Sequence, residues 1–347
     1  MPAATNHSRR SLWYLAPILA WAYAAGLIIL FVSRGLWSPW PSFFMLLSYL
    51  GPFLFAPLVG LAALAAVTRS KAVWGAVAAA GALFLVLYLP FLLPRPAPPR
   101  VAGRTLSVLT FNLGADRAAP ADLVGAIAGQ DADIVAVQEL VPATAEALRH
   151  GLSGRYPYQI LNAGLSETGL LSRFPILGSA RFHPADTGRT AIQARLEVDG
   201  TPVQVIVVHP EPPRPCWPPG PSLPAPLCYR ALDRYVADIA TRAAALPGPV
   251  LVLGDFNMSD QSTVYGRMAA VLGDAFREAG WGFGFTIPNA VQRRSLALPG
   301  PLVRIDYIFH SKEWLAEAAA VGCRGGSDHC FVQAWLRLRA PQSGLAR

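Results

Sequence analysis

Polar side chains that could carry chemistry recur at the ends of short apolar runs in the C-terminal two thirds of this 347-residue chain. Asn112 follows VLTF, Glu139 follows IVAVQ, and His209 follows VIVV. The pattern continues to a final Ser-Asp-His, and the full set is Asn112, Glu139, His209, Asp255, Asn257, Asp306, Asp328 and His329. Because strand ends converge on one edge of an α/β sheet, we expect these side chains to share one site.

The residue types in this set suit a site that binds a metal ion or a phosphate. Carboxylate and amide oxygens are the ligands that Mg²⁺ prefers, and imidazole can donate to a negatively charged oxygen. Each residue taken singly has an ordinary explanation: a strand-end Asn commonly forms a turn, and Asp-Phe-Asn could cap a helix. Several acidic groups at one edge are nevertheless costly to bury without a compensating cation or phosphate partner. The ordered set therefore favours a catalytic site.

The apolar runs and the segments between them predict the elements that position this site. The sequence EVDG at 197–200 is typical of a hairpin turn between two strands. Helical patterns lie between the runs, notably at 229–246 and 262–271. Apolar runs flanked by helices predict an α/β domain whose sheets are buried on both faces. The predicted strands are TLSVLTFN, DIVAVQE, TGLLSR, VQVIVVH, VLVLGDFN and RIDYIFH.

The ordered motifs TFN, QE, a strand-terminal His, GDFN, D-Y and SDH resemble those of the endonuclease/exonuclease/phosphatase superfamily. That superfamily includes exonucleases, neutral sphingomyelinases and inositol polyphosphate phosphatases. The resemblance covers about residues 104–340. It implies a four-layer sandwich of two mixed β-sheets flanked by helices. It also implies hydrolysis of phosphoric esters assisted by Mg²⁺ or Mn²⁺.

The resemblance assigns Glu139, helped by Asn112, to the metal ion, with Asp328 as a second candidate ligand of the metal or of water. One position departs from the pattern. Many nucleases of the superfamily have an acidic residue two positions after the first Asn, where this chain has Gly114. Two explanations stay open: the metal shell depends more on Glu139 and solvent, or Asp116 takes the missing place.

The resemblance also assigns the residues that act on the substrate. Asp255 would orient or deprotonate the attacking water, and Asn257 would donate to phosphoryl oxygens. His329 would contact the scissile phosphate as an imidazolium or a proton shuttle, and Asp306 would fix its tautomer. In members of the superfamily, the position of His209 holds a side chain that can donate a hydrogen bond to the negative charge that develops during the reaction.

The N-terminal part of the chain is apolar enough to cross a membrane several times. Only 14% of all residues are charged, against about 25% in ordinary soluble domains. Three apolar runs of about twenty residues or more predict transmembrane helices at 12–33, 43–67 and 73–93. A Pro-rich linker at 94–103 follows, and the catalytic domain occupies 104–347.

Flanking charges predict the orientation of these spans. Arg9 and Arg10 precede the first span, and Arg69 and Lys71 lie between the second and third. The loop between the first two spans holds only Arg34. The positive-inside rule then places the N-terminus in the cytoplasm and the catalytic domain outside it. SRRSLW resembles a twin-arginine export signal, but the apolar run behind it is too long for a signal core.

The cysteine count agrees with an extracytoplasmic domain. The four cysteines, Cys216, Cys228, Cys323 and Cys330, all lie outside the predicted spans. An even number of cysteines in an oxidising compartment predicts disulfides. Pairing each cysteine with its nearer neighbour needs the least chain distortion, although pairing Cys216 with Cys330 stays open. The Pro-rich segment 209–228 cannot form a helix or a central strand, so we expect an ordered loop or lid there.

The substrate is the least determined feature. The net charge of +8 comes from scattered arginines without a basic run, so patterning does not indicate a nucleic-acid surface. Trp217 and Trp281 could offer an apolar wall to a lipid chain, and Arg293 and Arg294 are the best candidates for a nucleic-acid groove. The sequence also permits a non-catalytic sensor on the same scaffold, and it implies no protein partner.

The three spans and the GFGFT…RIDY pattern are similar to VanJ-type teicoplanin-resistance proteins. That resemblance implies a membrane lipid phosphate or pyrophosphate as substrate, such as undecaprenyl pyrophosphate. A membrane-tethered extracellular nuclease or phosphodiesterase is the alternative.

Overall fold

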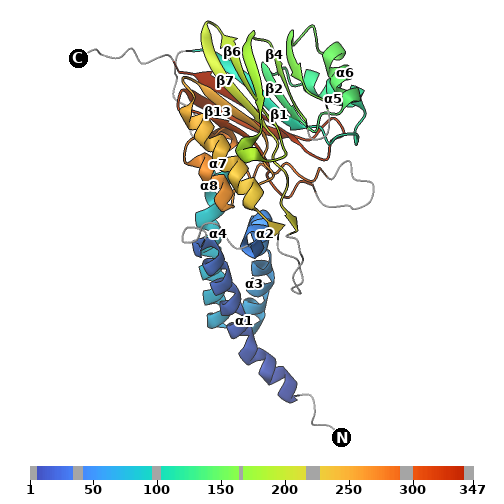
Figure 1. Ribbon diagram of the computed structural model, residues 1–347. Helices are drawn as coiled ribbons and strands as arrows, with labels where there is room; N and C mark the ends of the chain where they lie inside the picture. Colours follow the sequence, from blue (N-terminus) through green and yellow to red (C-terminus); the bar gives the residue numbers. More distant parts are fainter. Residues whose placement is uncertain are drawn as a thin grey trace, which may run out of the picture. The chain divides into compact units, whose positions relative to one another are not determined.

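The computed structural model describes residues 6–33, 42–95, 103–163, 167–215, 227–289 and 300–339. The chain divides into two compact units, Met1–Leu93 and Pro94–Arg347. The first unit is helical, and the second is built around β-sheets (Figure 1).

Three helices of the described residues are long and apolar enough to cross a membrane. They cover Leu15–Ser33, Leu47–Thr68 and Lys71–Leu92, with a mean hydropathy of 2.2, 2.1 and 2.1. The helical elements of this unit are α1 (Asn6–Ser33), α2 (Ser42–Leu50), the 3₁₀-helix η1 (Gly51–Phe55), α3 (Pro57–Thr68) and α4 (Lys71–Leu92).

The second candidate span is interrupted where the sequence predicted one continuous run. Pro52 lies in the first turn of η1, and Pro57 begins α3. Proline lacks a backbone N–H and is tolerated at the start of a helix, so each proline marks a new start. The hydroxyl of Tyr23 on α1 donates to the carbonyl of Leu54 at 2.6 Å, which ties the irregular turn to its neighbour.

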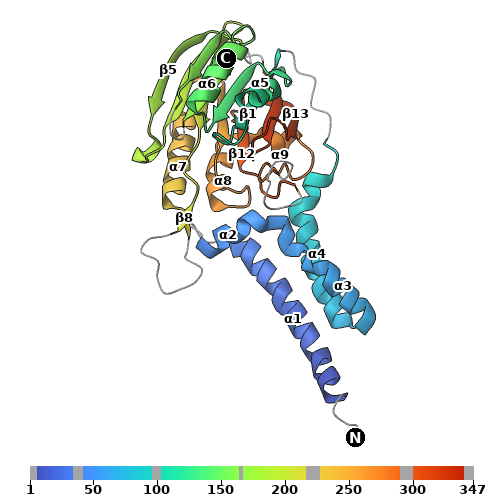
Figure 2. The same ribbon diagram turned by 90° about the vertical axis from the view of Figure 1, so that its right-hand side faces the viewer.

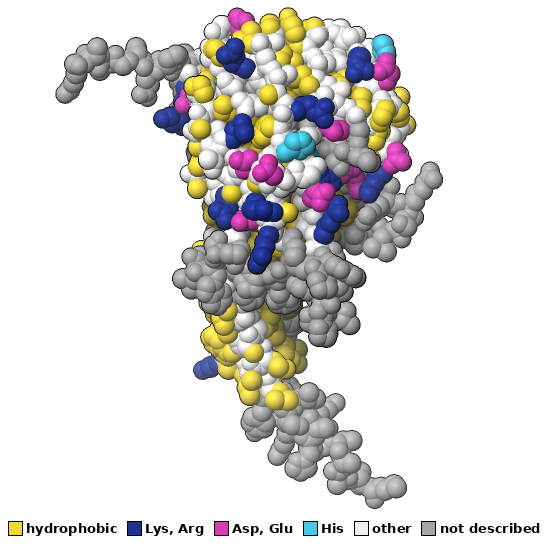
Figure 3. Space-filling model, viewed as in Figure 1, with side chains coloured by type: hydrophobic (Ala, Val, Ile, Leu, Met, Phe, Trp, Pro, Cys, Tyr) yellow, Lys and Arg dark blue, Asp and Glu magenta, His cyan; other side chains and the backbone are white. Residues whose placement is uncertain are grey.

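The outer surface of this unit is apolar. Val59, Val67 and Val86 each expose three quarters or more of their surface. Hydrophobic side chains dominate the described part of these helices in Figure 3, whereas basic and acidic side chains alternate on the drawn face of the second unit. Exposed apolar helices of this length are typical of membrane spans.

The second unit contains two six-stranded mixed sheets. The first has the order β13-β14-β1-β2-β4-β3, and the second has the order β11-β12-β10-β7-β6-β5. In each sheet one central pair is parallel, β1 with β2 and β7 with β10. The first sheet comprises β1 (Thr105–Asn112), β2 (Ile134–Gln138), β3 (Tyr158–Leu161), β4 (Thr168–Ser172), β13 (Trp314–Gly322) and β14 (Phe331–Leu338). The second comprises β5 (Ile176–Phe182), β6 (Ala191–Val198), β7 (Thr201–Val208), β10 (Val250–Asp255), β11 (Gly273–Asp274) and β12 (Asp306–His310).

Helices cover the outer faces of the two sheets, which confirms the predicted sandwich. Helices α5 and α6 lie on one side of the strands and α7 and α8 on the other (Figures 1 and 2). Alternate residues of β1 explain the layering: Val108 packs into the core between the sheets, and Leu109 packs under the outer helices. The helices are α5 (Pro120–Ala128), α6 (Pro142–Gly151), α7 (Arg230–Ala245), α8 (Thr263–Ala269) and α9 (Ala275–Ala279), with the 3₁₀-helix η2 at Pro184–Asp186.

The EVDG hairpin forms as predicted. Val198 pairs with Thr201 across Asp199 and Gly200, which have positive φ angles of 49° and 79°. Such angles define the tight turn that suits the twist of a hairpin. The Pro-rich segment forms a small ribbon, β8 (Arg214–Pro215) with β9 (Leu227–Cys228), and its middle lies outside the described residues.

Candidate functional site

Strand ends from both sheets bring the candidate residues to one edge. Asn112 ends β1, and Glu139 follows its parallel neighbour β2. In the second sheet His209 follows β7, and Asp255 ends its parallel neighbour β10. Asp306 begins β12, which runs antiparallel to β10, so it lies directly opposite Asp255. The site therefore forms where the two sheets face each other.

Asn112 joins the two sheets. Its amide nitrogen donates to Asp255 Oδ2 at 2.9 Å and to Glu139 Oε1 at 3.3 Å. Its amide oxygen accepts from the backbone N–H of Gly114 at 3.0 Å, which fixes the orientation of the side chain. Glu139 itself has a φ of 55°, a strained conformation for a non-glycine residue. Strain of this kind persists where the surroundings impose it, commonly at functional sites.

Asp255 is buried at the centre of the group. Gly254 precedes it, and a Cβ at that position would lie 2.1 Å from the carbonyl oxygen of Val208, so only glycine fits there. The backbone N–H of Asn257 donates to Asp255 Oδ1 at 2.8 Å. Burial and the nearby negative charge of Asp306 raise the pKa of Asp255 to about 7. A carboxylate with such a pKa can take up a proton near neutral pH.

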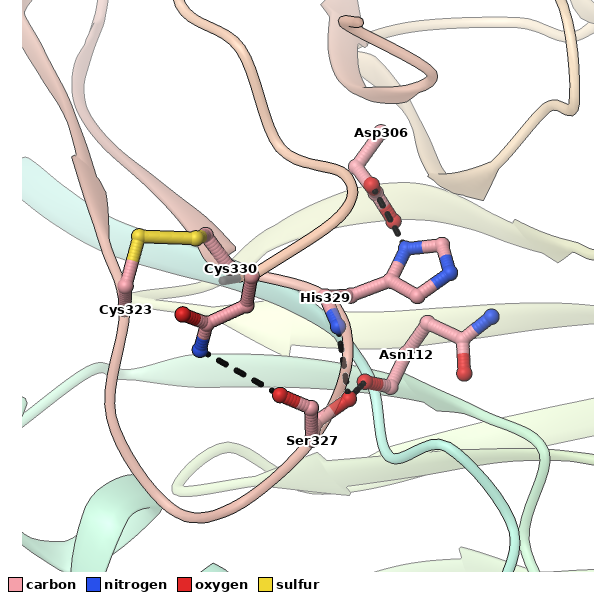
Figure 4. The surroundings of a disulfide bond; sticks show 7 residues. Asn112, Asp306, Cys323, Ser327, His329 and Cys330 are labelled. Carbon is pink, nitrogen blue, oxygen red and sulfur yellow. Dashed lines mark hydrogen bonds and ion pairs between the residues drawn. A yellow bond between two sulfur atoms is a disulfide. The ribbon is translucent and has the colours of Figure 1, made fainter. Parts of the chain in front are cut away.

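His329 and Asp306 form a buried pair. The Nδ1 atom of His329 lies 3.0 Å from Asp306 Oδ2 (Figure 4). Its Nε2 atom lies 3.8 Å from Asp255 Oδ2. Burial alone would lower the pKa of His329, but the charge and the hydrogen bond of Asp306 outweigh it and raise that pKa to about 9. The ring is therefore an imidazolium at neutral pH, with its free edge directed at Asp255.

The loop that carries His329 is attached to β1 by a hydrogen bond. The hydroxyl of Ser327 donates to the carbonyl of Asn112 at 2.7 Å and accepts from the backbone N–H of His329 at 3.0 Å (Figure 4). The loop is also closed by a disulfide between Cys323 and Cys330. These contacts hold His329 in place relative to the first sheet.

His209 is a neutral donor and not an ion-pair partner. Its Nε2 atom lies 3.7 Å from Asp255 Oδ2 and 3.9 Å from Glu139 Oε1, distances at which a charged ring would form ion pairs. Burial, together with the positive charges of Arg189 and His329, lowers the pKa of His209 to about 3. We therefore treat the contacts as those of a neutral imidazole.

Asp328 points to a different partner. Its carboxylate forms an ion pair with the guanidinium of Arg117. Gly114, with a φ of 70°, lies against it, because a Cβ there would be 2.9 Å from Asp328 Oδ1. The glycine that departs from the nuclease pattern thus leaves room for this pair. Asp116 is exposed.

The donor set fits a divalent cation. Ligand atoms of Asp255, Asp306 and His329 lie within 4.8 Å of one another. Asp306 Oδ1 is buried without a hydrogen-bond partner among the described residues. With Glu139, three carboxylates face one imidazolium, an excess of negative charge that a cation would neutralise.

Several predicted residues are not placed by the structure. Cys216, Trp217, Arg293 and Arg294 lie outside the described residues, as does the side chain of Cys228. Trp281 is described and is 69% exposed. The predicted pairing of Cys323 with Cys330 is confirmed, and the other pairing stays a prediction.

Arg189 is a site residue that sequence reasoning missed. It precedes β6, and the hairpin supplied a usable signal. Val198 pairs with Thr201 and Ile192 with Val207, and the same register continued by two steps would bring the residues before β6 toward His209. In the structure the Nε atom of Arg189 lies 3.5 Å from Glu211, two residues after His209, and its positive charge acts on the His209 ring.

Known structures of similar fold include one from a bacterium and one from a vertebrate. An endonuclease/exonuclease/phosphatase from Bacteroides vulgatus is 21% identical with a TM-score of 0.54, covering 68% of this chain and 100% of that one. D. rerio TDP2 complexed with a single-strand DNA product is 19% identical with a TM-score of 0.54, covering 67% and 99%. No curated protein matches the chain.

The family model described as the Endonuclease/Exonuclease/phosphatase family matches residues 109–329. This match runs from the middle of β1 to His329, so it includes the second sheet, most of the first sheet and every strand end that contributes to the site. By its motifs, its fold and this match, the chain belongs to the endonuclease/exonuclease/phosphatase family.

Proposed function

We propose that this protein is a membrane-anchored, divalent-metal-dependent phosphohydrolase that acts on a lipid phosphate or pyrophosphate. The observation that carries the proposal is the joined group of Asn112, Glu139 and Asp255, with His329 facing Asp255. It combines ligands for a hard cation with a base and an imidazolium at one sheet edge. The three apolar helices support action at a membrane.

Glu139, with Asn112, would hold Mg²⁺ or Mn²⁺. His329 is assigned to the phosphate, because its Nδ1 atom contacts Asp306 and its Nε2 atom faces Asp255. The Glu139 side chain is 32% exposed, which leaves it accessible to an ion from solvent. Oxygen ligands and retained water suit Mg²⁺. The ion when bound neutralises charge on the phosphoryl oxygens.

The remaining residues would position the reactants and move protons. Asp255 orients the attacking water and accepts its proton, because its pKa lies near the working pH. The Nε2–H of His329 donates to a phosphoryl oxygen, where its positive charge stabilises the transition state. Neutral His209 and the amide of Asn257 donate to the same group. Asp306 holds the His329 ring in orientation.

The loop at 280–288, which is rich in aromatic residues, supports a lipid substrate. The rings of Phe283 and Phe285 stack with centroids 5.1 Å apart, and Trp281 is exposed next to them. Two backbone hydrogen bonds attach the end of this loop to the catalytic loop: Cys330 N–H donates to Thr286, and Asn289 N–H donates to Asp328. An apolar wall of this kind could contact a polyprenyl chain.

The predicted membrane orientation also supports a lipid substrate. The flanking charges predict an extracytoplasmic catalytic domain, and the Cys323–Cys330 disulfide is expected in an oxidising compartment. The resemblance to VanJ-type proteins points to undecaprenyl pyrophosphate. An outward-facing site would reach the headgroup of such a lipid at the membrane surface.

Phosphate release from polyprenyl pyrophosphates by the full-length, detergent-solubilised protein tests the proposal. With Mg²⁺ we expect release from farnesyl and longer pyrophosphates, and loss of that release in Glu139→Ala and His329→Ala. Single- and double-stranded oligonucleotides serve as competing substrates. Ready cleavage of DNA without phosphate release from any polyprenyl pyrophosphate would establish the nuclease alternative instead.

A further inference from the structure

Arg189 lies at the site and has no role in the mechanism above. Its Nε atom lies 3.5 Å from Glu211 Oε1, and Glu211 follows His209 by two residues. The carbonyl of Pro210, between His209 and Glu211, accepts from the amide of Asn257 at 3.0 Å. The segment that Arg189 contacts therefore connects the two residues that the proposed function assigns to the phosphate.

The segment that carries Arg189 is also connected to the first sheet. The hydroxyl of Thr190 donates to Glu167 Oε2 at 3.1 Å. The backbone carbonyl of Glu167 accepts from the N–H of Leu140 at 3.1 Å, and Leu140 directly follows Glu139. The segment that carries Arg189 is therefore linked through Glu167 to the strand end that carries Glu139.

The guanidinium of Arg189 lacks hydrogen-bond partners for two of its nitrogen atoms among the described residues. Its side chain is only 13% exposed, and its nearest acidic contact is Glu211 Oε1, 3.5 Å from Nε. Within the described part of the chain, its Nε and Nη1 atoms are buried without a hydrogen-bond partner. Glu211 is shared with Arg214, which approaches the same oxygen at 3.4 Å. A buried cation with incomplete hydrogen bonding is costly unless a ligand completes it.

A phosphate is the ligand that this arrangement fits. Guanidinium groups bind phosphate oxygens through charged hydrogen bonds, and the buried Nε and Nη1 atoms of Arg189 are donors without a partner among the described residues. In the proposed mechanism the attacked phosphate faces His329, His209 and Asn257. Arg189 contacts Glu211, two residues after His209, so its cation suits the next phosphate along the substrate.

We propose that Arg189 binds the phosphate that is not attacked, which makes the site selective for a diphosphate over a monophosphate. The inference rests on the proposed function and sharpens its substrate class. Water oxygen forms a bond to the terminal phosphorus, and the bond from that phosphorus to the bridging oxygen breaks. The electron pair stays on the bridging oxygen of the departing monophosphate, where Arg189 stabilises it, and the water proton passes to Asp255.

Kinetics on a matched pair of substrates test the assignment. Full-length protein with Mg²⁺ is assayed on farnesyl pyrophosphate and farnesyl monophosphate. We expect Arg189→Gln to lower kcat/KM for the pyrophosphate roughly tenfold to hundredfold, the loss typical of a charged hydrogen-bond pair, and to change the monophosphate rate by less than about threefold. Arg189→Lys should recover part of the pyrophosphate rate, because it keeps the charge and loses the paired geometry.

Two further variants separate binding from packing. Arg214→Gln removes an exposed arginine that contacts the same Glu211 oxygen, and we expect it to keep the wild-type ratio. Glu211→Gln removes the acidic partner of Arg189 and should keep the preference for pyrophosphate. If Arg189 served only as an ion-pair partner, Glu211→Gln would reproduce the defect of Arg189→Gln.

Inhibition gives a readout that does not depend on turnover of the monophosphate. Inorganic pyrophosphate should inhibit Arg189→Gln roughly tenfold more weakly than wild type, with inhibition by orthophosphate little changed. An equal loss on both inhibitors, or no loss on either, overturns the assignment while the proposed function stands. A wild-type protein that releases no phosphate from farnesyl pyrophosphate contradicts the proposed function, and this assignment with it.

Discussion

Asn112 makes the two halves of the site depend on each other. Its amide group donates to Glu139 from the first sheet and to Asp255 from the second. A carboxylate that accepts such a bond is held in one rotamer, so a cation at Glu139 and a water at Asp255 would have a fixed separation. Positioning of this kind is what a hydrolase needs from residues that do not themselves react.

Glu139→Gln should lose metal binding while keeping its shape and its acceptor for Asn112. We expect the affinity for Mn²⁺ to fall about a hundredfold or more, because an amide replaces the charged ligand. Calorimetric titration of Mn²⁺ into the solubilised protein measures this directly. Asp116→Asn, at an exposed position nearby, is the matched control and should bind as wild type does. Equal loss in both variants would reject Glu139 as the ligand.

Asn112, Glu139, His209 and Asp255 were predictable because each one lies at the end of an apolar run. Their partners were not. The ion pair Arg117–Asp328 joins segments that are far apart in the sequence, and no local sequence pattern predicts such a contact. For Asp328, the sequence motif predicts a ligand of the metal or of water. The ion pair of its carboxylate with Arg117 is seen only in the folded structure.

At the scale of elements, the loop before β14 that carries His329 is held by a disulfide and by hydrogen bonds. The disulfide spans Cys323 and Cys330, which are seven positions apart, and Ser327 connects the interior of the loop to β1. Strand β1 and its predicted limits agree, residue for residue. The predicted second span does not stay one helix, because two prolines restart it.

Replacing both cysteines of this loop by serine should destabilise the catalytic unit. Closing an eight-residue ring removes about 2.5 kcal/mol of chain entropy from the unfolded state. We expect a loss of that order in the free energy of unfolding, measured by urea titration, and a lower kcat because His329 is less well held. The double variant at Cys216 and Cys228 is the comparison. Unchanged activity and stability in Cys323→Ser/Cys330→Ser would show that the hydrogen bonds alone shape the loop.

A second pair of elements is joined by a charged histidine. His310 at the end of β12 has Nε2 at 3.1 Å from Glu278 on α9 and Nδ1 at 3.0 Å from the carbonyl of Ser311. Both contacts require a hydrogen on the ring. Although burial opposes it, the hydrogen bond and charge of Glu278 raise the pKa of His310.

This pair predicts a pH-dependent stability. The stabilisation is fully present below the unfolded pKa of about 6.5 and is lost as pH rises through the higher folded pKa. Glu278→Gln should therefore cost on the order of 1 kcal/mol near pH 6 and much less at pH 9. Thermal unfolding of both proteins across that range measures the difference. A cost that stays constant with pH would mean that the pair contributes no charge interaction.

At the scale of the whole molecule, the chain combines apolar helices with a hydrolase fold in one polypeptide. The charges that flank the helices predict which side of the membrane the second unit occupies. The orientation limits the substrate, because an extracytoplasmic site would reach lipid headgroups of the outer leaflet and would not reach cytoplasmic nucleic acid.

Labelling of introduced cysteines in intact cells tests the orientation. Ser153 is an exposed residue of the second unit, and Ser70 lies between α3 and α4. In a background without the native cysteines, a membrane-impermeant maleimide should label Ser153→Cys and leave Ser70→Cys unlabelled until the cells are opened. The reverse pattern would place the catalytic unit in the cytoplasm and remove the basis for an outer-leaflet substrate.

The origin of the site residues in two separate sheets has a practical meaning. Neither sheet alone carries all the site residues: Asn112 and Glu139 come from the first sheet, and His209, Asp255 and Asp306 come from the second. The proposed activity therefore requires that the two sheets pack against each other as in the native fold. An expanded intermediate that keeps its strands but loses the packing between the two sheets would retain a native far-UV circular dichroism spectrum. It would nevertheless lack enzymatic activity. An activity assay is therefore the most sensitive gauge of native assembly for this protein.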